Sequence, residues 1–224
     1  MAAVQIDHFS DVLCVWAYFS EPRIAEVERN FCETVAITYR FVPVFGDMAG
    51  KIAASWESKG GYDAFADHTH QNAKQFPELY ISAKVWREAR PASSLSPHLY
   101  LKAIDLCEKE GHCPAGAFAK TVSKMRVAFF AHGHDIAQAA VQQAVGDGEG
   151  VKAETVRDFL KDGRAHAALS ADYKAAEVLG ISGSPTLVLN QGRQKLYGNV
   201  GYRIIEANIQ ELLRGPKADE ASWC

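Results

Sequence analysis

Hydrophobic and polar residues alternate over the first ten positions of the chain. Val4, Ile6 and His8 alternate with Gln5, Asp7 and Phe9, a period of two that predicts a short β-strand. The stretch from Val15 to Phe31 then carries Ile24, Val27 and Phe31 at helical spacing. Residues 35–44 are rich in β-branched and aromatic side chains and predict a second strand. The chain therefore opens as strand, helix, strand, and Pro22 predicts a kink or a restart inside the helix.

The middle of the chain follows a different period. Phe118, Val122, Met125 and Phe129 lie at i, i+4, i+7 and i+11, which places them on one face of a helix. Glycine- and proline-containing stretches divide the region from residue 46 to residue 165. No clear strand is predicted there. We expect an inserted subdomain of four to six helices.

Mixed structure returns near the end of the chain. A helix ends at Gly180, and Thr186-Leu187-Val188-Leu189 predicts a strand after Ser184-Pro185. The turn Asn190-Gln191-Gly192-Arg193 leads to a second strand that returns beside the first, and the two strands make a hairpin. A final amphipathic helix precedes a tail from Gly215 to Cys224. Four segments follow: 1–45 and 166–214 as two halves of one α/β domain sharing one sheet, 46–165 as the helical insertion, and 215–224 as the tail.

Composition limits the classes of function. The 224 residues are 48% hydrophobic and 23% charged, with a formal net charge of −3. This composition is ordinary for a globular protein and offers no positive field for nucleic acid or acidic lipid. No apolar run is long enough to span a bilayer, and the first residues do not resemble a secretory signal. We therefore expect a cytoplasmic protein with no nucleic-acid or membrane partner, and a homodimer is left open.

Cys14 is the leading candidate for chemistry among the five cysteines. It follows a predicted strand at the point where a helix begins, and a helix N-terminus lowers the pKa of a thiol. The sequence predicts a reactive thiolate with a depressed pKa there, and the alternative is a small buried apolar residue. A Cys107–Cys113 disulfide is a minor alternative, and a contact of Cys224 with Cys14 a still smaller one. His68 with His70 and His132 with His134 lack further ligands at a metal-site spacing, so no metal is expected.

Two motifs resemble those of one known family. Phe9-Ser10-Asp11-Val12-Leu13-Cys14-Val15-Trp16-Ala17-Tyr18 resembles the active-site turn of the DsbA family, particularly of its FrnE-like branch. The family turn reads S-D-x-x-C-P-W-C-Y. Gly183-Ser184-Pro185-Thr186 resembles the cis-proline segment of thioredoxin-like folds. The segments 125–136 and 179–198 match in order. The resemblance implies an α/β thioredoxin-like fold with a large all-helical insertion, and a cis Ser184–Pro185 bond facing Cys14.

The resemblance also implies a function and a set of site residues. Val15 replaces the family's proline and Ala17 replaces its second cysteine, so a mixed disulfide on Cys14 needs an external thiol for its release. We expect a thiol-disulfide oxidoreductase with one active-site cysteine, no bound cofactor, and glutathione or a disulfide-containing molecule as its partner. Cys14 would be the nucleophile, and the implied substrate-binding residues are Ser10, Trp16, Ala17, Ser184, Pro185 and Thr186.

Two other functions remain open at this stage. The same superfamily includes kappa-class glutathione transferases and 2-hydroxychromene-2-carboxylate isomerases, in which Cys14 or Ser10 would hydrogen-bond the thiolate of bound glutathione. A protein that kept the fold and lost catalysis together with its second cysteine is the third hypothesis.

Overall fold

A four-stranded mixed sheet forms the centre of the computed structural model, which describes residues 3–214. The strand order is β2-β1-β3-β4. β1 (Val4–Ser10) runs parallel to β2 (Val35–Phe41) and antiparallel to β3 (Thr186–Leu189), which pairs in turn with β4 (Gln194–Tyr197). The two ends of the described chain therefore share one sheet, as the sequence predicts.

The helices account for most of the remaining chain. They are α1 (Val15–Asn30), α2 (Met48–Ser55), α3 (Gly61–Ala73), α4 (Leu95–Lys109), α5 (Ala117–Phe130), α6 (Ala139–Gly148), α7 (Ala153–Lys161), α8 (Arg164–Val178) and α9 (Tyr202–Arg214), with 3-10 turns at η1 (Glu57–Lys59) and η2 (Asn190–Gly192). Between residues 46 and 163 of the described chain no strand longer than an isolated bridge occurs. The helical insertion and the C-terminal hairpin are thus confirmed.

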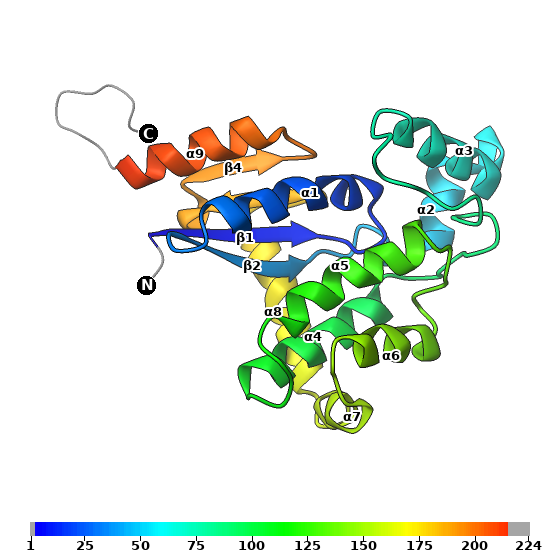
Figure 1. The fold of residues 1–224 in the computed structure, drawn as a ribbon. Helices are drawn as coiled ribbons and strands as arrows, with labels where there is room; N and C mark the ends of the chain where they lie inside the picture. Colours follow the sequence, from blue (N-terminus) through cyan, green and yellow to red (C-terminus); the bar gives the residue numbers. More distant parts are fainter. Residues whose placement is uncertain (1–2, 215–224) are drawn as a thin grey trace.

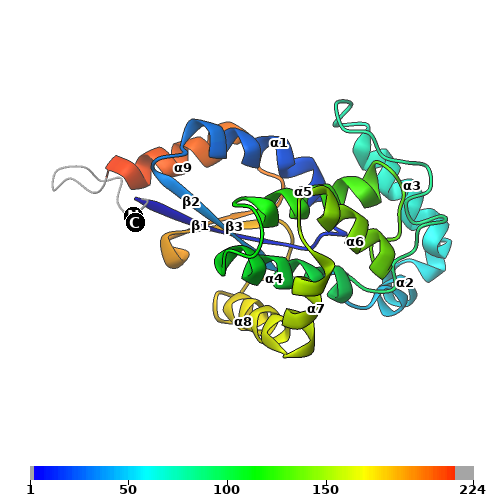
Figure 2. The same ribbon diagram turned by 60° about the horizontal axis from the view of Figure 1, so that its bottom comes forward.

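The sheet is covered on both faces because its strands alternate apolar side chains between them. Ile6, Leu187 and Leu189 belong to the main core, which also takes in Ile205 and Ile209 of α9. Phe9 and Val188, on the opposite face, pack in a second cluster with Ala176 of α8. Figure 2 shows α8 on the side of the sheet away from α1 and α9.

The helical segment is joined to the sheet through a shared core. The main hydrophobic cluster runs without interruption from the strands through α4, α5 and α7. Arg126 of α5 is fully buried, donates to Ser10 Oγ at 2.7 Å and pairs with Glu21 of α1. Figure 1 shows α2 and α3 lying beyond the C-terminal end of β1. The exact boundaries 45/46 and 165/166 stay predictions, and α8 begins just before the second of them.

Pro22 does not divide the first helix. α1 is one continuous helix with Pro22 inside it, so the predicted restart is wrong. Proline lacks the backbone N–H that would donate within the helix. A side-chain hydrogen bond forms nearby, because Arg23 Nη1 donates to the Phe19 carbonyl at 2.7 Å. Within the described residues, no helix combines the length and apolar character that a bilayer crossing needs.

Candidate active site

Cys14 occupies the N-cap position of α1, directly after the turn that follows β1. Its backbone is extended (φ −82°, ψ 116°), and its N–H donates to the Asp11 carbonyl at 3.1 Å. Its own carbonyl accepts from the N–H groups of Ala17 and Tyr18, each at 3.1 Å. The turn therefore fixes the thiol at the helix end where unpaired N–H groups gather.

Ser184 brings the second motif against this turn, 170 residues along the chain. The Cys14 thiol donates to the Ser184 carbonyl over 3.2 Å, and Asp11 N–H donates to Ser184 Oγ at 2.9 Å. The Ser184–Pro185 peptide bond is cis, and Gly198 N–H donates to the Pro185 carbonyl at 2.8 Å. The two sequence motifs thus form one site at the edge where β1 ends and β3 begins.

The Asp11 carboxylate stabilises the turn from the buried side. Its Oδ1 accepts Leu13 N–H at 2.9 Å, and its Oδ2 accepts Phe45 N–H at 2.8 Å and the Ser94 hydroxyl at 2.7 Å. His98 accepts the next donor, Val12 N–H, at 3.2 Å through Nε2. The side chains of Asp11, Ser94 and His98 are fully buried, so a network from the helical insertion fixes the Cys14 turn.

A cavity of about 410 Å³ opens beside the site. It is lined by Trp16, Gln75, Phe76, Ser184, Tyr197, Gly198 and Asn199. The Tyr197 ring lies on Gly183, where a Cβ atom would meet the ring at 2.3 Å, so a larger residue there would displace the exposed Tyr197 side chain. Arg23 Nη1 donates to Asn199 Oδ1 at 3.0 Å and orients that amide. Aromatic faces and amides side by side suit a small peptide-like ligand.

A second, smaller cavity of about 80 Å³ lies on the other side of Trp16. Cys14 contributes to its lining together with Leu13, Val15, Trp16, Phe45, Phe65, His68, Thr69, Asn72 and Trp86. Phe45 and Trp86 are stacked with ring centroids 5.9 Å apart. The thiol therefore faces a narrow, mostly apolar space, with polar groups only from α3.

The comparisons with known proteins agree with this geometry. The model of the DSBA-like thioredoxin domain matches residues 106–210. The chain has a DsbA-like thioredoxin fold. No curated protein matches the sequence.

Solved structures resemble this chain over nearly its whole length. A probable DsbA oxidoreductase from Streptomyces coelicolor superposes with a TM-score of 0.73 at 18% identity, covering 97% of this chain and 93% of that one. The cytosolic disulfide reductase DsbM from Pseudomonas aeruginosa gives 0.68 at 17%, covering 92% and 98%, and it has also been solved with GSH. A 2-hydroxychromene-2-carboxylate isomerase gives 0.63 at 18%, covering 94% and 96%. At these identities the likeness establishes the fold.

The Cys14 thiol of the DsbA-like protein is not the low-pKa group that its helix position predicts. Only 4% of the residue is exposed, and burial raises its pKa above the ordinary value of 9.0. The bond to Ser184 and the N–H groups of Ala17 and Trp16 act in the opposite direction, while the Asp11 carboxylate adds to the rise. Desolvation of a thiolate exceeds the stabilisation by the helix end here, so the sequence-based expectation of a depressed pKa is wrong.

Alkylation of Cys14 should therefore be slow at neutral pH. We expect the rate with iodoacetamide, followed by site-resolved mass spectrometry, to rise with an inflection above pH 9.0. Since only the thiolate reacts, the rate at pH 7 should be at least about a hundredfold below the plateau. The variant Cys14→Ser lacks this thiol, so its alkylation comes from the other cysteines alone. An inflection near neutral pH would contradict the role assigned to burial.

The other predicted site residues divide into two groups. Trp16 and Ser184 line the larger cavity, and Pro185 is buried behind Ser184. Ser10 and Ala17 are fully buried and line neither cavity. The side chain of Thr186 is also buried and donates to the Gly183 carbonyl at 3.0 Å. The structure thus leaves the side chains of Ser10, Ala17 and Thr186 out of the surface that a ligand would touch.

Several lining residues were not found by sequence reasoning. Tyr197 pairs with Thr186 across the hairpin. Pairing the residues of the two predicted strands, starting from the turn at 190–193, would have placed Tyr197 near Ser184. Gln75 and Phe76 follow α3 in the insertion, and Asn199 follows β4. Nothing local in the sequence distinguishes Gln75 or Phe76, because only the packing of the insertion brings them to Trp16.

Cys32, Cys107 and Cys113 do not join the site, whereas His68 lines the smaller cavity beside Cys14. Cys32, Cys107 and Cys113 carry free thiols, as does Cys14, and Cys224 lies outside the described residues. A Cys107–Cys113 disulfide is therefore absent, although the two thiols interact by a hydrogen bond. Among residues 3–214, no group of three or more potential metal ligands comes together.

Proposed function

We propose that this DsbA-like protein exchanges thiols and disulfides through Cys14 alone, with glutathione as its co-substrate. The observation that carries the proposal is the Cys14 thiol held 3.2 Å from the Ser184 carbonyl at the start of α1, with alanine at position 17. Within the described part of the chain, neither cavity beside Cys14 is lined by a second cysteine. Among residues 3–214, therefore, no neighbouring thiol could release a disulfide formed on Cys14.

The reaction would proceed in two exchanges. The Cys14 thiolate attacks the glutathione sulfur of a mixed disulfide, the bond to Cys14 forms, and the substrate sulfur leaves and takes up a proton. The thiolate of a second glutathione then attacks the glutathione sulfur bound to Cys14, which yields oxidised glutathione and restores the Cys14 thiolate. The net reaction converts the mixed disulfide and one reduced glutathione into the substrate thiol and oxidised glutathione, so one disulfide bond is exchanged for another.

The residues around Cys14 support these steps. The backbone N–H groups of Trp16 and Ala17 favour the thiolate, and they would do so at both exchanges. The backbone at Ser184 lies beside the thiol, where an extended peptide such as glutathione can pair with it. The cavity of about 410 Å³ begins at Ser184 and offers the amides of Gln75 and Asn199 to such a ligand.

Mass spectrometry of the intact protein tests the proposal. We expect wild-type protein to gain one glutathione on Cys14 after incubation with oxidised glutathione, and reduced glutathione to remove it. Cys14→Ser should gain none at this position, because the nucleophile is lost. The fully buried thiol implies slow formation near neutral pH, so incubation is repeated at high pH. Absence of any Cys14 adduct at high pH would contradict the exchange reaction.

A glutathione transferase or isomerase is the second candidate. The raised pKa of Cys14 favours it, because a protonated thiol can donate a hydrogen bond to the sulfur of bound glutathione. This candidate predicts tight glutathione binding without an adduct. Neither binding nor an adduct would leave a non-catalytic binding protein as the best description.

A further inference from the structure

A groove separate from the Cys14 site lies between α5 and α6. Its volume is about 670 Å³, within the range of roughly 300–1,000 Å³ that small-molecule sites occupy. It is lined by Lys124, Val127, Ala128, His132, His134, Ala140, Val141, Ala144, Val145, Gly148 and Glu149. No residue of this groove lines either cavity beside Cys14.

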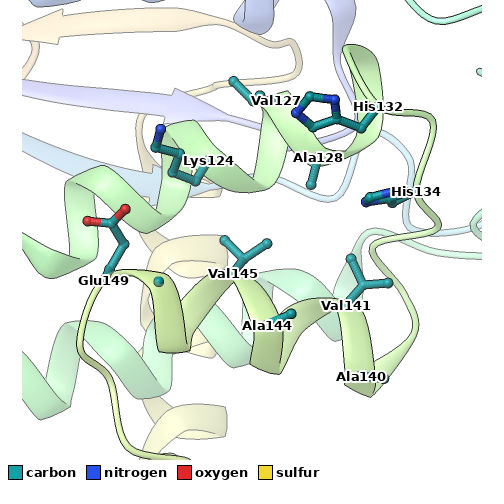
Figure 3. Close-up of a pocket in the computed structure, with 11 residues that line it drawn as sticks. Lys124, Val127, Ala128, His132, His134, Ala140, Val141, Ala144, Val145 and Glu149 are labelled. Carbon is teal, nitrogen blue, oxygen red and sulfur yellow. The ribbon is translucent and has the colours of Figure 1, made fainter.

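The groove exists because α6 presents small side chains to α5. Ala140, Ala144 and Gly148 recur every four residues, which puts them on one face of α6. Val127 on α5 and Val141 and Val145 on α6 are half-buried and pack on the core beneath. Figure 3 shows Ala128 of α5 and Val141, Ala144 and Val145 of α6 facing the space between the two helices. The floor is therefore apolar, and the small residues leave room above it.

The polar groups of the groove gather at its two ends. Figure 3 shows Lys124 and Glu149 at one end and His132 and His134 at the other. The first end carries one positively and one negatively charged side chain, so the two charges offset each other there. The second end has two exposed imidazoles, with ring centroids 5.9 Å apart, and none of the lining residues there is acidic.

The histidine end is also where α6 begins. Its first turn contains no acidic residue, and the N-cap residue Gln138 makes no side-chain cap bond. The nearest acid, Asp135, is already engaged, since its Oδ1 accepts Ala137 N–H at 2.9 Å and its Oδ2 accepts the Gln138 amide at 3.3 Å. A helix N-terminus favours negative charge. The start of α6 therefore favours an anion at the same end of the groove as the two imidazoles.

From this arrangement we propose that the α5–α6 groove binds a small amphipathic carboxylate, an organic acid with an apolar chain. The chain lies on Val127, Val141 and Val145 between the helices. The carboxylate lies at the His132–His134 end, where imidazole N–H groups donate to it. The site is independent of the proposed exchange reaction at Cys14.

Calorimetry with octanoate and 1-octanol tests the site on the full-length protein. Octanoate should bind, and the neutral alcohol of equal length should bind at least about tenfold more weakly, because it lacks the charge-assisted bonds. The double variant His132→Ala/His134→Ala should lose about tenfold in octanoate affinity and none in octanol affinity. His166→Ala, an exposed histidine on α8, is the matched control and should bind like wild type.

A variant that fills the groove gives the second arm. Ala144→Phe should abolish octanoate binding, because the ring occupies the space of the chain, while Ala167→Phe at an exposed alanine of α8 should not. Both positions are exposed, so folding should be retained, which circular dichroism checks. No octanoate binding to wild type would overturn the proposal, as would full binding to Ala144→Phe. Equal affinity for acid and alcohol would also overturn it.

Discussion

Ala17→Cys is expected to convert the Cys14 turn into a two-cysteine site and to raise disulfide-reductase activity at least about a hundredfold. A thiol three residues along a helix start lies on the same face as Cys14, within the span of a disulfide. Effective concentrations of well-placed intramolecular groups far exceed the millimolar concentration of an external thiol. Release of the mixed disulfide from Cys14 would then no longer wait for glutathione.

Insulin reduction in the presence of dithiothreitol measures this gain. Ala17→Ser is the matched control, because it adds an atom of similar size at the same fully buried position without a thiol. Thiol counting should show a disulfide between Cys14 and the thiol introduced at position 17 in the oxidised variant. A folded variant that forms this disulfide and is no more active than Ala17→Ser would contradict an exchange function.

The second large effect concerns Asp11 and the pH dependence of stability. Burial raises the pKa of Asp11 from 3.8 to about 6, against the lowering effect of the bonds from Leu13, Ser94 and Phe45. The folded protein therefore holds a proton that the unfolded chain has already released. Stability from this group is complete below pH 3.8 and is lost as pH rises through about 6.

Asp11→Asn replaces the titrating carboxyl with an amide. The fall in the free energy of unfolding that Asp11 causes as pH rises from 3.8 to about 6 should then disappear. We expect the free energy of unfolding of the wild type, relative to the variant, to fall by about 2.5 kcal/mol between pH 4 and pH 7, since a pKa difference of one unit corresponds to about 1.4 kcal/mol and a small part of the change falls below pH 4. Urea denaturation at several pH values measures it. Asp63→Asn, with a carboxylate side chain 70% exposed, is the control. A constant difference across this range would mean that Asp11 titrates at its ordinary value.

Asp11 matters for Cys14 as well as for stability. Its carboxylate links the Cys14 turn to Phe45 and to Ser94 of the insertion, which lie in different segments, and its charge contributes to the raised pKa of the thiol. The buried network therefore sets both the geometry of the turn and the protonation of the thiol.

Local sequence patterns were sufficient for the elements and for the two motifs. Alternation over residues 4–9 and the turn at 190–193 predicted strands that the sheet contains. Cys14 was expected at a helix start because a strand and a turn precede it, and this position is its N-cap. These features depend on near neighbours along the chain, which is why periodicity and turn chemistry reveal them.

Tertiary packing decided what the motifs could not. The sequence by itself determined the order of elements, the cysteine at the start of α1 and the absence of a second cysteine at position 17. Only the tertiary structure showed that the insertion buries Cys14 and raises its pKa, that Ser10 is covered, and that Gln75 and Phe76 reach Trp16. The reason is physical: a pKa depends on which groups exclude water from the thiol, and those groups come from segments far away in the sequence.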